Sequence, residues 1–409
     1  MNKSTLAPFS IMTIAGTGEP GYTGDGGPAL EAMLNEPKSI TAAGGLLYIA
    51  DAENHRIRRL DLQTGIITTV AGGGFFTEAS SRSNPPSFPP ASSAVEEDPL
   101  ADPDAENQPR FVQLPDQSGT VRFVTGTAEK GRFRGDGGQA TEATLNFPSA
   151  SAVDSLGTLY IADTFNHRVR RVDATSGLIT TVAGTGAARF NGDNGPGVKA
   201  ALNEPVALAV DERAGRLYIA DLANYRVRAV ELTTGRIFTY AGNGNSDYDG
   251  DGQAAIEAGL SGPSGLALDA EGNLYITDTF SGRIRRVDSN SGMIMTVAGD
   301  GTEYRYQGNP KEFSTGLARP TGIALAADGK LYITDSDNHL IRMWNPKSKI
   351  ITSIVGKGAP EFSGDGGPAN ASGLNYPFGV AVDGPGNIYI ADTFNHRIRM
   401  IAAADTPAP

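Results

Sequence analysis

The sequence has 409 residues, of which 39% are hydrophobic and 20% are charged, a balance typical of a globular protein. It contains no Cys, which excludes disulfides, thiolate metal sites and cysteine nucleophiles. A formal net charge of -12 at pH 7 disfavours nucleic acid and anionic lipid as partners. No apolar run approaches the roughly 20 residues of a membrane span, so we expect no membrane insertion.

The first predicted element is an N-terminal strand, Ile11 to Gly16, with the sequence IMTIAG. The residues before it hold one Lys and no long apolar core, so we expect no signal peptide. This indicates a cytoplasmic location, or an extracellular or periplasmic one if a leader was removed upstream. The strand is similar to the last strand of the repeating unit that follows, yet no first strand precedes it.

A segment of the form YIAD followed by NHRIRR recurs six times along the chain. Its Asp returns at spacings of 112, 58, 57, 57 and 57 residues, at Asp51, Asp163, Asp221, Asp278, Asp335 and Asp392. Each unit contains four short runs typical of strands, separated by turns: one after a Pro, one with Tyr-Ile, one rich in Arg and one β-branched. Repetition of such units predicts an all-β fold, a β-propeller of four-stranded blades.

The two ends of the chain predict how the propeller closes. The last unit stops after the strand Ile398 to Ile401 and lacks its fourth strand. We therefore expect Ile11 to Gly16 to pair with this C-terminal blade and to close a ring of six blades. The gap of 112 residues between the first two copies is about two units long, so a seventh blade is the alternative.

Four segments follow from this pattern. Residues 1–72 hold the closing strand and the first blade, and residues 73–119 are a Pro-rich acidic insertion with the start of a β-hairpin. Residues 120–401 hold the remaining five units, and residues 402–409 are a tail. The composition of the insertion predicts an extended or mobile segment, either a docking arm or a tolerated insertion.

The units resemble NHL repeats. The loop GYTGDGGPALEAMLNEP and the hairpin YIAD with NHRIRR carry the resemblance, which covers nearly all of the chain except residues 73 to about 119. NHL repeats form six-bladed propellers, so the resemblance implies that fold. It implies little about activity, because the family includes bacterial sensor ectodomains, teneurin-like surface proteins, RNA-binding proteins and a peptide-amidating lyase.

The copies act as controls on one another, since a residue present in every copy is expected to build the blade. The recurring Asp and Arg of the hairpin belong to this class, and we predict that they pair across it. The four histidines also share one slot of the hairpin, on different blades. A structural hydrogen bond is therefore favoured over a shared zinc ion for His55, His167, His339 and His396.

One loop differs from the others in its acidic residues. Asp247, Asp249 and Asp251 precede a Gly in the pattern D-x-D-x-D-G, which opens a calcium-binding loop. The twelfth position is Ala258, so the bidentate carboxylate of that motif is missing, and a solvated acidic loop is the alternative. We expect no other cofactor.

The largest differences between copies fall at the residues that flank the Pro before the first strand of each unit. In a propeller these residues surround the entrance to the central channel, here called the mouth. The ligand-binding candidates at the mouth are Glu36, Lys38, Phe147, Glu204, Arg319, Tyr376 and Phe378. Three rings in the turn after the second strand are predicted to lie on the same face, where they can bind a ligand or pack on a loop: Phe165, Phe280 and Phe394.

The favoured function is a non-catalytic scaffold that binds a protein, peptide or glycan through its loop-rich face. The alternative is a metal-dependent hydrolase, lactonase or lyase with an ion at the mouth, held by Glu36 and Glu204. The spacing assigns no catalytic residue. RNA binding through a basic patch of Lys130, Arg132 and Arg134 is disfavoured by the net charge.

Overall fold

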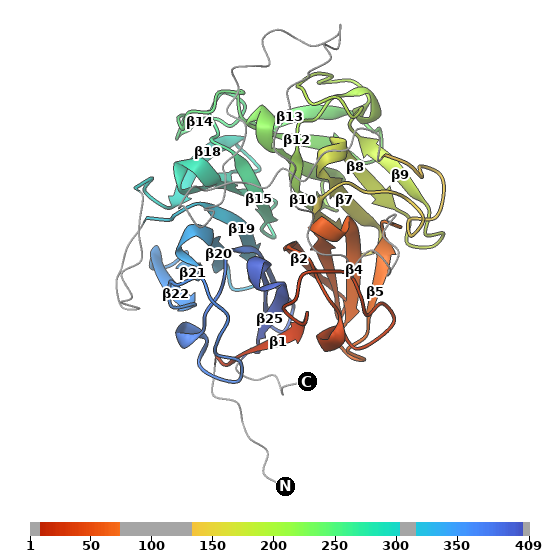
Figure 1. The fold of residues 1–409 in the computed structure, drawn as a ribbon. Coiled ribbons are helices and arrows are strands. Elements are labelled where there is room, and N and C mark those ends of the chain that lie inside the picture. Colours follow the sequence, from red (N-terminus) through yellow and green to blue (C-terminus); the bar gives the residue numbers. More distant parts are fainter. Residues whose placement is uncertain (1–8, 74–132, 303–315, 404–409) are drawn as a thin grey trace, which may run out of the picture. The chain divides into compact units, whose positions relative to one another are not determined.

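In the computed structural model of the protein, residues 9–73, 133–302 and 316–403 are described, and all of them belong to one compact unit. They form six antiparallel sheets arranged as the blades of a ring (Figure 1). Residues 74–119 of the predicted insertion lie outside the described residues, as do Lys130 and Arg132 of the basic patch. No helix of the described ranges is long and apolar enough to cross a membrane.

Each blade has four main strands, which are given from the innermost to the outermost. Blade 1 holds β2 (Pro37–Ala43), β3 (Leu46–Asp51), β4 (Arg56–Asp61) and β5 (Ile67–Ala71), and blade 2 holds β6 (Pro148–Val153), β7 (Leu159–Asp163), β8 (Arg168–Val172) and β9 (Ile179–Ala183). Blade 3 holds β10 (Pro205–Asp211), β11 (Arg216–Asp221), β12 (Arg226–Glu231) and β13 (Ile237–Ala241). Blade 4 holds β15 (Pro263–Leu268), β16 (Leu274–Asp278), β17 (Arg283–Val287) and β18 (Met293–Ala298), with β14 (Gln253–Ala254) added at its outer edge. Blade 5 holds β19 (Pro320–Leu325), β20 (Leu331–Asp335), β21 (Leu340–Asn345) and β22 (Ile350–Val355), and blade 6 holds β23 (Pro377–Val382), β24 (Ile388–Asp392), β25 (Arg397–Ile401) and β1 (Ile11–Ala15).

The ring closes as predicted, by pairing of the two ends of the chain. The N-terminal β1 lies antiparallel to β25, with Ile11 opposite Ile401 and Met12 opposite Met400, and Figure 1 shows red β1 beside blue β25. Each innermost strand contacts the innermost strands of both neighbouring blades. Since β2 and β6 are in direct contact, no blade lies between the first two copies, and the seven-blade alternative is wrong.

The strands are apolar on both faces because each blade packs between two others. One core cluster, for example, joins Tyr160 and Ala162 of blade 2 to Leu217 and Ile219 of blade 3. Small residues such as Ala162 and Ala220 alternate with larger ones at these interfaces, so the sheets approach closely. Burial on both faces thus follows from stacking and not from a single central core.

Each blade also contains the predicted ion pair of Asp and Arg. In blade 1 the fully buried Arg58 places Nη1 3.4 Å from Asp51 Oδ2 and Nη2 2.7 Å from Asp25 Oδ1, and its guanidinium lies 4.9 Å from the centroid of the Tyr22 ring. Asp51 Oδ1 accepts a 2.7 Å hydrogen bond from the N–H of Asn35. The pair therefore fixes the loop that leads into the mouth.

Candidate functional site

The residue before each innermost proline has a left-handed backbone. The φ angle is 50° at Glu36, 51° at Phe147, 57° at Glu204, 54° at Arg319 and 48° at Tyr376, and the sixth position is Gly262. Residues other than Gly rarely adopt this conformation, which costs about 1–3 kcal/mol. Five mouth side chains are therefore held in place by a strained backbone that the surrounding contacts must stabilise.

The histidines supply one of these contacts. The N–H of Glu36 donates to Nδ1 of His396 at 3.2 Å, and the N–H of Glu204 donates to Nδ1 of His167 at 3.2 Å. His55 and His339 accept from Phe147 and Tyr376 in the same way. Burial lowers the pKa of His167 to about 4, so this imidazole is neutral at pH 7 and its Nδ1 can accept. The predicted hydrogen-bonding role is confirmed, with each histidine positioning a mouth residue of the next blade.

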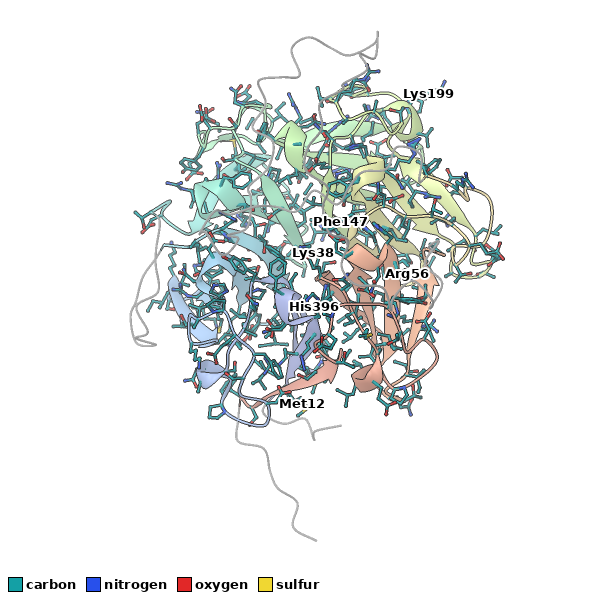
Figure 2. The ribbon with its side chains drawn as sticks, in the orientation of Figure 1. Met12, Lys38, Arg56, Phe147, Lys199 and His396 are labelled. Carbon is teal, nitrogen blue, oxygen red and sulfur yellow. The ribbon has the colours of Figure 1, made fainter. Side chains whose placement is uncertain are left out.

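Lys38 lies at the centre of the mouth residues of blades 6, 1 and 2. Its Nζ is 2.9 Å from Oε2 of Glu36, and both side chains are mostly buried, with 12% and 15% exposed. The same Nζ lies 4.5 Å from the ring centroid of Phe378, 5.2 Å from that of Phe394 and 5.5 Å from that of Phe147. Figure 2 shows Lys38 and Phe147 close together near the axis of the ring. Such contacts stabilise an ammonium group by about 0.5–2 kcal/mol.

The structure brings the two predicted groups of aromatic residues together on this side of the mouth. The rings of Phe147 and Phe165 are stacked with centroids 4.9 Å apart, and Phe394 makes edge contacts with Tyr376 at 5.6 Å and with Phe378 at 6.1 Å. Phe280 is separate from this cluster. It covers the space above Gly262, where a Cβ would come within 2.5 Å of its ring, and is 46% exposed.

The remaining mouth residues have different surroundings. Arg319 pairs with Asp337, with Nη2 3.3 Å from Oδ2. Burial raises the pKa of Glu204 to about 8, so this carboxyl group carries a proton at neutral pH. Glu36 is on blade 1 and is engaged by Lys38, whereas Glu204 is on blade 3. In the described ranges no three His, Asp or Glu side chains are grouped so that they could hold a metal ion.

Three acidic residues are proposed to bind calcium, and two of them are in contact with groups of blade 4. Asp251 Oδ1 lies 2.9 Å from Nη2 of the buried Arg285 and accepts a 2.8 Å hydrogen bond from the N–H of Thr296. Asp249 Oδ1 accepts from the N–H of Gly259. Asp251 thus has the same role as Asp25 in blade 1. Calcium binding at Asp247, Asp249 and Asp251 stays a prediction.

Glu53 is a mouth residue that the sequence analysis missed. It occupies the slot that holds Phe165 and Phe394 in other copies, so an alignment of all six copies would have found it. Its Oε1 is buried and has no hydrogen-bond partner among the described residues. Burial, and secondly the charge of Glu36, raise the pKa of Glu53 to about 7, while Lys38 opposes this shift.

A row of hydroxyl groups joining neighbouring blades was also missed. The Oγ1 of Thr393 donates to the carbonyl of Pro37 at 2.8 Å, which joins blade 6 to blade 1. Thr164, Thr279 and Ser336 make the same bond to the proline of the following blade. The signal in the sequence is the Thr or Ser that follows the recurring Asp in four copies.

Comparison with known proteins identifies the repeat. The model of the NHL repeat matches residues 34–60 and 317–343, and that of the teneurin NHL domain matches residues 241–311. The chain thus contains NHL repeats, and its described residues form a six-bladed β-propeller. The NHL match at 34–60 includes Glu36, Lys38 and Glu53, so the mouth of blade 1 is part of a recognised repeat.

Relatives of this NHL propeller are longer proteins. Human NHL repeat-containing protein 2 is 27% identical over 322 residues, which cover 70% of this chain and 42% of that protein. The chloroplastic protein SUPPRESSOR OF QUENCHING 1 of Arabidopsis thaliana is 29% identical over 294 residues, which cover 69% of this chain and 26% of that protein. The chain thus spans less than half the length of either relative.

A solved structure with the same fold is an auxiliary nutrient binding protein from Bacteroides thetaiotaomicron. It superimposes with a TM-score of 0.60 at 15% identity, over 96% of this chain and 76% of that chain. At this identity the likeness concerns the fold of the NHL propeller alone.

Proposed function

We propose that this NHL propeller is a non-catalytic binding module that holds a protein segment, peptide or glycan at its mouth. The observation that carries the proposal is the cluster of Phe147, Phe378 and Phe394 around Lys38. These residues differ from copy to copy, whereas the residues that build the blades repeat. Functional residues are expected at positions that differ between the copies, because the blade itself does not require these side chains.

The chemistry of the cluster supports binding rather than turnover. Aromatic rings offer a large rigid surface at a small entropic cost, and Lys38, Glu36 and Glu53 add charged groups that can orient a ligand. The alternative hydrolase has less support. Its metal site would use Glu36 and Glu204, but these residues belong to blades 1 and 3, and Glu36 is paired with Lys38.

The experiment is a binding screen with the full chain against a peptide array and a glycan array, followed by affinity measurements on variants. Phe394→Ala removes a half-buried ring of the cluster, and we expect it to weaken binding at least tenfold. Phe238→Ala, which removes a ring from the outer strand β13 of blade 3, is the matched control and should bind as the wild type does.

Two results would contradict the proposal. One is a ligand whose affinity is unchanged in Phe394→Ala while both variants keep the wild-type melting temperature. The other is a stoichiometric metal ion in the purified protein that is lost in Glu204→Gln, because it would indicate the metal-dependent enzyme instead.

A further inference from the structure

The surroundings of Lys38 are those of a bound ammonium ligand. Three aromatic rings and one carboxylate surround its Nζ, and the rings come from both neighbouring blades: Phe378 and Phe394 from blade 6, and Phe147 from blade 2. Rings and a carboxylate around one cation form the arrangement with which proteins recognise amines and quaternary ammonium groups. We call Phe147, Phe378, Phe394 and Glu36 the cage.

Lys38 is not needed to build the blade. The same slot in other copies holds Ser149, Val206, Ser264, Thr321 or Phe378. The hydroxyl groups of Ser264 and Thr321 bond to carbonyl groups of the following blade, at 3.0 Å and 3.1 Å. Lys38 instead points its ammonium group into the cage. The blade 1 copy therefore has a cation at a position where Ser264 and Thr321 have a structural role in their own copies.

The charges at the cage also favour a cationic ligand. Glu36 and Glu53 supply two carboxyl groups, and Lys38 supplies one ammonium group, which is bonded to Glu36. Oε1 of Glu53 is buried and has no hydrogen-bond donor within the described part of the chain. Two carboxyl groups are therefore present for two ammonium groups, that of Lys38 and that of a ligand entering the mouth.

We propose that the cage is a recognition site for an organic ammonium group, the lysine side chain or terminal amine of a peptide, and that Lys38 occupies it until such a ligand displaces it. The inference rests on the proposed binding function and names the chemistry of the ligand. An internal occupant lowers the apparent affinity, because a ligand binds only to the fraction of molecules in which the cage is vacant. The flexible four-carbon stem of Lys38 allows its ammonium group to leave towards solvent.

The test uses the full chain, tetramethylammonium as the probe and calorimetric or NMR titration as the readout. Lys38→Ser introduces the residue that this slot holds at Ser149 and Ser264, and it removes the whole stem and vacates the cage. We therefore expect tetramethylammonium to bind at least tenfold more tightly than to the wild type. Lys199→Ser is the matched control, because Lys199 is an exposed lysine far from the mouth in Figure 2, and its affinity should equal that of the wild type. Adding Phe378→Ala to Lys38→Ser should abolish the gain.

Lys38→Ala is a second vacating variant in case Lys38→Ser does not fold, and a melting curve is recorded for each protein. Folded vacated variants that bind tetramethylammonium no better than the wild type would overturn the inference. Loss of acetate binding in these variants would overturn it too, because Lys38 would then serve an anionic ligand. A second arm compares a lysine peptide with a form acetylated at both Nε and the N-terminus, and equal affinity of the vacated variants for the two peptides would also overturn the inference. The proposed binding function would survive each failure if the array ligands still required Phe394.

Discussion

In five of the six blades the buried arginine is held by two carboxylates in different environments, and this predicts two very different mutational costs. In blade 6, Nη1 of Arg399 lies 3.2 Å from Oδ2 of the fully buried Asp392, and Nη2 lies 2.7 Å from Oδ1 of Asp365, whose side chain is 37% exposed. Asp392 also accepts hydrogen bonds from the N–H of Asn375 at 2.7 Å and from Nδ2 of Asn395 at 2.9 Å.

Replacing Asp392 by Asn keeps the shape but puts an NH₂ group in place of one oxygen that accepts hydrogen bonds, and it removes the buried charge beside Arg399. Breaking a buried ion pair by removing one partner costs about 3–5 kcal/mol, so we expect Asp392→Asn to lower the free energy of unfolding by this amount. The same change at Asp365 removes a partly exposed partner that solvent can replace, and it should cost about 0–1 kcal/mol.

Urea unfolding of both variants, followed by circular dichroism and by the fluorescence of the single Trp, measures the two costs under identical conditions. The ordering of the two values is the decisive quantity. Equal losses, or a larger loss for Asp365→Asn, would refute the view that burial of the inner carboxylate determines the strength of the ion pair.

Three further predictions concern the ring and its mouth. Thr393→Val removes the 2.8 Å bond to Pro37 without changing the size of the side chain, and calorimetry should show a loss of about 1–2 kcal/mol. Burial raises the pKa of Glu204 from 4.5 to about 8, so the folded protein binds a proton that the unfolded chain releases, and wild-type stability falls as the pH rises through this window. Glu204→Gln should therefore gain stability relative to the wild type as the pH rises from 5 to 8, by up to about 1.4 kcal/mol for each pH unit, and a pH-independent difference would contradict the shift. Deleting β1 should expose the edge of β25 and cause self-association, which light scattering detects.

Much of the fold could be predicted from the sequence because its determinants are local and repeated. The copies show the same four strands, except that the last copy lacks its fourth, and the strand at Ile11 has the character of a fourth strand without an accompanying blade. The pairing of Asp and Arg was predictable for a similar reason, since Asp51 and Arg58 lie on the two paired strands of one hairpin. The hydroxyl bonds between blades were not predicted, because one copy alone does not show which carbonyl the next blade presents.

The candidate site could be predicted only in part. The mouth positions follow from the propeller geometry, but the cage joins Lys38 to Phe378 and Phe394 at the opposite end of the chain. Ring closure alone brings them together, and no spacing in the sequence encodes their distances. Glu53 was not predicted because three other copies hold Phe in its slot, and a single carboxylate there gives no signal of its own. The role of Asp251 could have been found, since Asp25 and Asp365 hold the same loop position.

Most of the cage lies at the boundary between blades 6 and 1, where the N-terminal and C-terminal parts of the chain meet. Lys38 and Glu36 belong to the N-terminal part of the ring, whereas Phe378 and Phe394 belong to its C-terminal part, and β2 contacts β23 at this boundary. The Thr393 bond to Pro37 crosses the same boundary. A ligand that binds side chains from both parts favours the closed ring over any open form, because it binds only when they are together. Recognition at the mouth and closure of the propeller are therefore thermodynamically linked, and a ligand that contacts Phe378 and Glu36 together should also slow the separation of β1 from β25.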